Sequence, residues 1–239
     1  MLPRLALALL AAAVPALVAA EPLLEPFAAK GSVPAPPWHV VGLPRQSKPF
    51  TQFSVVDIDG VRGLRIEAIE SYGNLVHPLR FGGSSAHLAW QWRIERPIET
   101  ADLHSRGGDD TAVKVCVSFD LPIENISFGD RQVLRFARAT SADPVPGATV
   151  CYVWDAHLAA GAMLDNAFTR RIRYVVVRGG TMPLHKWMSE RRDLAADFNR
   201  LFGAEIDHMP PIVAIAVGAD SDNTHTHSLA YVASLVLEP

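Results

Sequence analysis

Residues 113–119 read Val-Lys-Val-Cys-Val-Ser-Phe, and apolar and polar side chains alternate at each position. Because successive side chains of a strand point to opposite faces, the three valines and Phe119 share one apolar face. Lys114, Cys116 and Ser118 share the other face. A strand with one apolar and one polar face is typical of an antiparallel sheet that is buried on one side.

Similar short runs recur along the chain, at 53–58, 64–68, 88–94, 149–154, 173–177, 212–217 and 229–237. Asp59-Gly60 separates the first two runs and predicts a hairpin turn. Two helices are predicted, over 131–139 and over 190–202, the second ending at Gly203. The strands do not alternate regularly with helices, so we predict an all-β, mainly antiparallel, jelly-roll-like β-sandwich with one or two accessory helices.

Two tryptophans, Trp90 and Trp92, lie on one face of the run 88–94 together with Leu88 and Ile94. That face could serve as a platform for stacking sugar rings. Four large apolar residues at every second position are more typical of a core, and we interpret the face in that way.

The composition excludes two classes of protein. The chain has 239 residues, of which 49% are hydrophobic, so it is not a disordered protein. Its 22 basic residues against 25 acidic ones leave no basic surface for nucleic acid.

The first residues, MLPR followed by an alanine- and leucine-rich run, have the pattern of a secretory signal peptide over 1–20. We therefore predict a periplasmic or secreted protein with no membrane span after signal removal, a Pro-rich leader and first edge segment over 21–52, and one β-sandwich domain over 53–239.

Seven short motifs occur along the chain in an order that is typical of one protein family. They are Leu88-Ala-Trp-Gln-Trp-Arg-Ile, Gly108-Asp-Asp-Thr-Ala-Val-Lys-Val, Tyr152-Val-Trp, Asn166-Ala-Phe-Thr, Glu190-Arg-Arg-Asp-Leu-Ala-Ala-Asp-Phe, Ala214-Ile-Ala-Val and Asp220-Ser-Asp-Asn-Thr. Together they resemble the bacterial secreted family known as domain of unknown function 3047. The resemblance implies a signal-bearing bacterial protein and supplies no activity. The last strand, 230–236, also resembles the closing strand of jelly-roll carbohydrate-binding modules, which is a likeness of fold.

The chain has two cysteines, Cys116 and Cys151, and each lies on the more polar face of its predicted strand. In an oxidising compartment two such thiols on neighbouring strands favour a disulfide. The alternative is two unpaired thiols on separate strands, and neither interpretation makes a catalytic cysteine.

Two acidic segments are candidate ligand sites. Asp220-Ser-Asp-Asn-Thr directly follows a predicted strand, so Asp220, Asp222, Asn223 and Thr224 could bind Ca²⁺ or sugar hydroxyls. The plain alternative is a turn in which these side chains bind nearby backbone amides. The second segment is the adjacent pair Asp109 and Asp110, which joins the site if the fold brings the pair to Asp220 and Asp222.

Three further residues are weaker candidates. His225 and His227 could bind Zn²⁺ together with Asp220 and Asp222, although the sequence offers no obvious further ligand. Arg191 is a candidate counter-ion for the acidic loop, and its plain interpretation is a solvated charge.

The chain shows no phosphate-binding loop, nucleophile elbow or helix-borne His-Glu-x-x-His motif. We therefore expect a non-catalytic module that binds glycan or another polar envelope ligand, with structural Ca²⁺ as a candidate cofactor. One alternative is a carboxylate-based hydrolase of envelope polysaccharide, in which two of the aspartates act as acid and base. A second alternative is a structural or interaction protein of the cell envelope.

Overall fold

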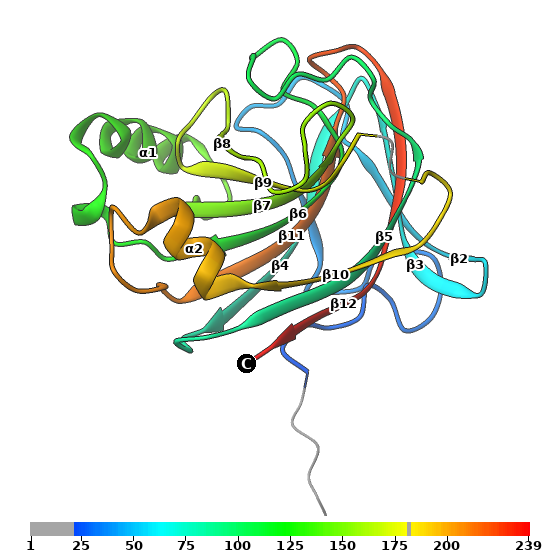
Figure 1. The fold of residues 1–239 in the computed structure, drawn as a ribbon, viewed down its shortest axis with the longest axis horizontal. Helices are drawn as coiled ribbons and strands as arrows, with labels where there is room; N and C mark the ends of the chain where they lie inside the picture. Colours follow the sequence, from blue (N-terminus) through cyan, green and yellow to red (C-terminus); the bar gives the residue numbers. More distant parts are fainter. Residues whose placement is uncertain (1–21, 181–182) are drawn as a thin grey trace, which may run out of the picture.

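The computed structural model describes residues 22–180 and 183–239, and the chain forms two β-sheets that pack face to face (Figure 1). The predicted signal peptide, residues 1–20, lies outside the described residues. In chain order the elements are β1 (His39–Val41), β2 (Gln52–Ile58), β3 (Val61–Ile69), β4 (Tyr72–Phe81), β5 (His87–Arg96), β6 (Thr111–Phe119), the 3₁₀ turn η1 (Ile123–Asn125), α1 (Phe128–Thr140), β7 (Ala148–Asp155), β8 (Met163–Asp165), β9 (Ile172–Gly179), β10 (Met188–Asp193), α2 (Leu194–Phe202), β11 (Ile212–Asp220) and β12 (His227–Glu238). The predicted β-sandwich with accessory helices is confirmed.

One sheet has seven strands in the order β1-β4-β11-β6-β7-β9-β8, and the other has five in the order β10-β5-β12-β3-β2. Among the strands that the structure describes, only β7 and β9 pair in parallel. β2 and β3 form the predicted hairpin, in which Ile58 pairs with Val61. Asp59 and Gly60 both have positive φ angles, 49° and 77°, as a two-residue type I′ turn requires.

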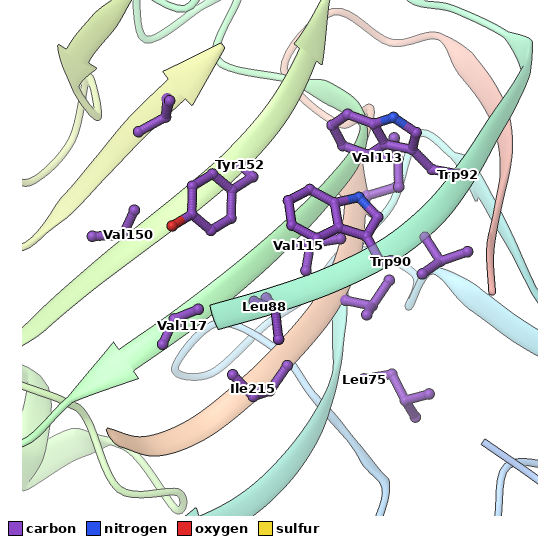
Figure 2. Packing of buried hydrophobic residues seen from close by; sticks show 14 of the residues in the cluster. Leu75, Leu88, Trp90, Trp92, Val113, Val115, Val117, Val150, Tyr152 and Ile215 are labelled. Carbon is purple, nitrogen blue, oxygen red and sulfur yellow. The ribbon is translucent and has the colours of Figure 1, made fainter. Parts of the chain in front are cut away.

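The sandwich core lies between the sheets and is rich in aromatic side chains. Trp90 and Trp92 of β5 point at β6 and β7 of the other sheet and are each 1% exposed (Figure 2). The ring centroid of Trp90 lies 5.3 Å from that of Tyr152 and 5.5 Å from that of Trp92. This burial confirms that the two tryptophans are core residues and leaves them unavailable as a sugar platform.

The predicted helix over 190–202 is wrong in its first four residues. These belong to β10, which pairs with the edge of β5, and the helix starts only after Asp193. The Asp193 side chain accepts a hydrogen bond from the backbone N–H of Ala196 at 3.0 Å, which makes it the N-cap. Pairing with an available sheet edge has overridden the local helical pattern.

Both helices lie at one end of the molecule (Figure 1). Phe198 of α2 packs on Phe119, with ring centroids 4.7 Å apart, whereas α1 has one fully buried residue, Leu134. No helix in the described ranges is long and apolar enough to cross a membrane.

The Pro-rich segment before β1 packs against the sandwich. Leu24, Phe27 and Trp38 are all buried, and the indole N–H of Trp38 donates to the Glu25 carbonyl at 2.8 Å. The segment thus contributes apolar side chains to the core although residues 22–37 form no strand.

Candidate functional site

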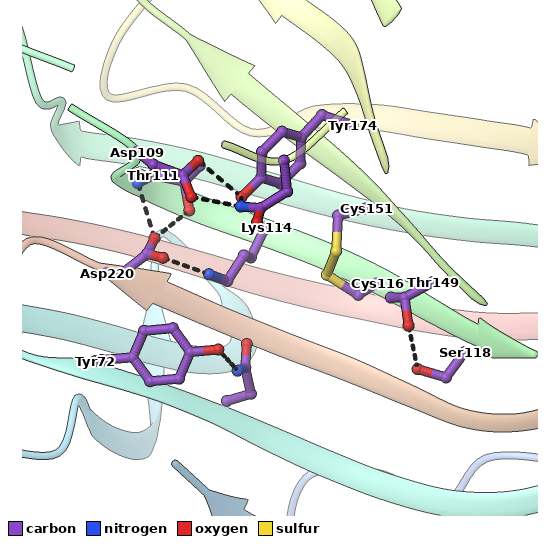
Figure 3. The surroundings of a disulfide bond; sticks show 12 residues. Tyr72, Asp109, Thr111, Lys114, Cys116, Ser118, Thr149, Cys151, Tyr174 and Asp220 are labelled. Atoms are coloured by element: carbon purple, nitrogen blue, oxygen red, sulfur yellow. Dashed lines mark hydrogen bonds and ion pairs between the residues drawn. A yellow bond between two sulfur atoms is a disulfide. The ribbon is translucent and has the colours of Figure 1, made fainter. Parts of the chain in front are cut away.

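The two cysteines lie on the face of the seven-stranded sheet that points away from the five-stranded sheet, which we call the outer face. Cys116 of β6 is directly opposite Cys151 of β7, and the two are joined by a disulfide (Figure 3). The next pair on the same face, Ser118 and Thr149, shares a hydrogen bond of 3.2 Å between hydroxyls. The alternation of 113–119 therefore separates the core face of β6 from its outer face as predicted, but the outer face is buried too, and the predicted bridge is present.

A buried ion pair lies further along the same face. Asp220, the last residue of β11, accepts hydrogen bonds from the Thr111 amide at 2.8 Å and the Thr111 hydroxyl at 2.6 Å, and from Lys114 Nζ at 2.6 Å. The side chains of Lys114 and Asp220 are only 7% and 5% exposed. Burial by itself lowers the pKa of Lys114, but the neighbouring Asp220 carboxylate outweighs burial and the pKa is raised.

Asp109 lies beside this pair at the start of β6. Its Oδ1 accepts a hydrogen bond from the Tyr174 hydroxyl at 3.1 Å, and its Oδ2 accepts one from the Asn166 amide (Figure 3). Burial, with the negative charge of Asp220 as the second cause, raises the pKa of Asp109 to about 6. The face therefore holds two carboxylates in different environments, one ion-paired and one not.

Asp110 has a different role. Its two carboxylate oxygens accept four hydrogen bonds from the loop after β11: from the Asn223 amide (3.3 Å), the Asn223 side chain (3.1 Å), the Thr224 amide (2.7 Å) and the Thr224 hydroxyl (2.6 Å). Both oxygens are occupied by donors of the chain itself. Asp110, Asn223 and Thr224 thus tie the loop to the start of β6 through contacts between distant parts of the chain, whereas the turn interpretation predicted bonds to nearby backbone amides.

The arrangement of these aspartates does not fit a calcium ion. The oxygens of Asp110 and Asp220 accept N–H and O–H donors, which a cation would have to displace. Asp222 keeps one buried oxygen without a partner, and burial followed by the charges of Asp110 and Asp220 raises its pKa. Within residues 22–180 and 183–239, no three His, Cys, Asp or Glu side chains are placed to share a metal.

The remaining candidates are engaged elsewhere. His225 and His227 follow the acidic loop, but each ring faces a glutamate. Arg191 of β10 is paired within the five-stranded sheet. Their partners are Glu70 (3.3 Å from His225), Glu67 (3.1 Å from His227) and Glu238 (2.9 Å from Arg191). The structure therefore joins Asp109 and Asp110 to Asn223 and Thr224 through hydrogen bonds, brings Asp220 near Asp109, and does not add these three residues to them.

Two polar residues that the sequence reasoning missed complete the outer face. Asn74 Nδ2 donates to the Tyr72 hydroxyl at 3.1 Å, and Lys114 Nζ lies 5.0 Å from the centre of the Tyr72 ring (Figure 3). A Cβ added to Gly218 of β11 would come within 2.2 Å of Asn74 Oδ1, so the amide occupies space that only glycine leaves free. Both Tyr72 and Asn74 are half-buried, in contrast to the fully buried Lys114.

The opposite part of the outer face is covered. Leu103, in the connection between β5 and β6, packs on the disulfide, together with the partly buried Leu158 and Leu164. The side that stays partly accessible is therefore the β4 side, where Tyr72 and Asn74 lie. Chemically, this side offers an aromatic ring, a phenol hydroxyl and an amide beside a buried ion pair.

The family model described as "protein of unknown function (DUF3047)" matches residues 36–236 of the chain. None of the curated protein sequences matches. Among solved structures, the chain is similar to an arabinose-bound α-L-arabinofuranosidase, with 9% identity and a TM-score of 0.41 over 91% of this chain and 26% of that one. It is also similar to an exo-β-agarase, with 13% identity and a TM-score of 0.42 over 92% of this chain and 25% of that one. The chain thus spans about a quarter of the length of each enzyme chain, and its function has to be inferred from its own residues.

Proposed function

The chain belongs to the DUF3047 family, and we propose that it is a non-catalytic module that binds a hydroxyl-rich ligand of the glycan class on the β4 side of the outer face. The observation that carries this proposal is the pair Tyr72 and Asn74, half-buried beside the fully buried Lys114–Asp220 ion pair. We also propose that the protein is secreted or periplasmic, which the buried disulfide supports.

The Tyr72–Asn74 pair is held in place before any ligand arrives. The hydrogen bond between the two side chains and the lack of a side chain at Gly218 fix the Asn74 amide. The Tyr72 hydroxyl accepts from Asn74, so its own proton remains available to a ligand, and the Asn74 carbonyl oxygen remains an acceptor. Preorganised donors and acceptors next to an aromatic ring suit sugar hydroxyls, because little ordering entropy is lost on binding.

A carboxylate-based hydrolase is the second candidate, and the specific observation in its favour is Asp109. A carboxyl group whose pKa lies near 6 can donate a proton at mildly acidic pH, while the neighbouring Asp220 is ion-paired with Lys114. Both carboxylates are buried and bonded to groups of the chain itself, so a substrate would first have to displace those partners. Binding without catalysis requires no such rearrangement, and we prefer it.

The test is a thermal-unfolding screen against cell-envelope oligosaccharides, with peptidoglycan fragments and lipopolysaccharide core sugars as probes. A ligand at a hundred times its dissociation constant adds about 2.7 kcal/mol to the free energy of unfolding. For a chain of this size, that raises the midpoint by roughly 5–10 °C. The variants are Tyr72→Phe and Asn74→Ala, and the matched control is Gln91→Ala on the outer face of the five-stranded sheet.

A bound oligosaccharide should raise the thermal midpoints of the native protein and the Gln91 control equally. The Tyr72 and Asn74 variants should lose most of this increase. The proposal is contradicted if no oligosaccharide raises the thermal midpoint, or if the Asn74→Ala variant binds like the native protein. The alternative of a structural or interaction protein of the cell envelope then remains. Release of shortened sugars that depends on Asp109 contradicts the non-catalytic form and supports the hydrolase.

A further inference from the structure

Helix α1 presents large apolar side chains to solvent. Phe128, Phe136 and Val133 are 75%, 72% and 58% exposed. Successive residues of an α-helix turn by about 100°, so these three lie within an arc of about 140°. We call them the exposed apolar face of α1. Unlike scattered surface apolar residues, they are gathered on one side of one helix.

The opposite side of α1 faces the core and the connections on either side of the helix. Leu134 is buried, Arg131 donates to the carbonyl oxygens of Glu124 and Ile126 at 3.0 Å each, and Arg138 donates to the Val145 carbonyl at 2.9 Å. The helix therefore does not need its exposed apolar face for its own attachment. The face is held outward as a rigid surface.

The charge on α1 is opposite in sign to that of the whole chain. Its charged residues are Asp130 and three arginines, a net of +2, whereas the chain has a formal net charge of −3. Arg135 is exposed and lies next to Phe128 around the helix, at the border of the apolar face. Asp130 faces Arg171 at 3.4 Å, so the acidic charge is already paired.

Two phenylalanines and a valine bordered by Arg135 on one exposed helix face complement an anionic lipid surface, where the rings enter the headgroup region and the guanidinium group meets phosphates. We propose that the protein docks on anionic phospholipid membranes through the exposed apolar face of α1, with the helix lying in the plane of the surface. This proposal is independent of the glycan proposal, because α1 follows the Phe119 end of β6, whereas Tyr72 pairs with Asp220 at the other end of the sheet.

The test is co-sedimentation with vesicles of phosphatidylglycerol and phosphatidylethanolamine, compared with vesicles of phosphatidylcholine alone. We expect Phe128→Ser/Phe136→Ser to weaken binding to the anionic vesicles by about tenfold or more. Arg135→Gln should weaken it by about fivefold, and only at low salt. The matched control is Phe50→Ser, which removes an equally apolar ring, 52% exposed, next to Tyr72 and away from α1.

Because all three substituted side chains on α1 are exposed, their thermal midpoints should stay within about 2 °C of the native value. Binding of native protein and of the Phe50 control to anionic vesicles, with loss in the α1 variants, supports the proposal. Native protein that stays in solution with both vesicle types overturns it and assigns the face to a protein partner. Equal binding of native protein and the double phenylalanine variant overturns it as well.

Discussion

Replacing Asp109 with asparagine should remove a pH dependence of stability that the native fold contains. The pKa of Asp109 rises from an ordinary value of 3.8 to about 6, because burial and the charge of Asp220 disfavour its ionised form. That rise corresponds to about 3 kcal/mol.

The direction of this pH dependence follows from which state, folded or unfolded, binds the Asp109 proton more tightly. The folded protein holds the Asp109 proton up to about pH 6, whereas the unfolded chain releases it near 3.8, so the contribution favours folding at acidic pH. It is lost as the pH rises, with about 2 of the 3 kcal/mol lost between pH 4 and pH 6. An asparagine has no proton to lose, so the variant keeps a constant contribution.

The assay is urea unfolding of native protein and Asp109→Asn, followed by tryptophan fluorescence at half-unit steps from pH 4.5 to pH 7.5. The informative quantity is the difference between the two free energies of unfolding, because other titrating groups contribute equally to both proteins. This difference should move in favour of the variant as the pH rises and level off above about pH 6.5. A constant offset would reflect only the contacts that asparagine makes with Tyr174 and Asn166.

A difference that does not change with pH refutes the reasoning, since it means that Asp109 is ionised at the same pH in the folded and unfolded states. A difference that moves against the variant refutes it equally. Carbon-13 NMR of the Asp109 carboxyl group separates these outcomes from compensating effects, because it reports the protonation of that group directly.

Three further substitutions test the packing around the site. Lys114→Met should lower the free energy of unfolding by about 3–5 kcal/mol in urea titrations, because Asp220 then remains buried without its partner, and a smaller loss in Lys114→Met/Asp220→Asn would confirm the cause. The double variant Cys116→Ala/Cys151→Ala should lose about 3–4 kcal/mol, since the bridge joins residues 35 positions apart, and native protein treated with reductant should match it in calorimetry. Trp90→Ala should lose about 3–5 kcal/mol by leaving a cavity between the sheets, and a loss below 1 kcal/mol would contradict its place in the core.

The parts of the fold that the sequence predicts well are those with strict alternation. β5 and β6 were both predicted within two residues of their observed ends, because their apolar faces are built from residues that tolerate no other environment. β4 was missed. It contains Gly73, Asn74 and Pro78, and such residues are depleted in strands, yet pairing with β1 and β11 and the burial of Leu75 in the core hold it in the sheet.

The difference between local patterns and long-range pairing also explains how much of the candidate site the sequence predicts. Local sequence correctly identified Asp109, Asp110 and the 220–224 segment as polar groups at strand ends, but it could not show which atoms meet. Asp110 and Asn223 come together across 113 positions of sequence, so only the pairing of β6 with β11 makes them neighbours. Tyr72 was hidden by the failure to predict β4. The one available signal was Lys114, the only charged residue of β6.

The buried polar groups of the outer face contribute little to the stability of the fold. Burying a lysine and an aspartate removes both from water, and such a pair stabilises a fold little or not at all compared with apolar residues of similar volume. Asp109 adds a further unfavourable contribution at neutral pH, because it must ionise while buried. A sheet that needed only stability would be better served by the leucines and the disulfide that cover the β7 side of the same face. Lys114 lies over the Tyr72 ring at the accessible β4 side, and a ligand that binds Tyr72 and Asn74, as we propose, would use an arrangement that folding alone does not require.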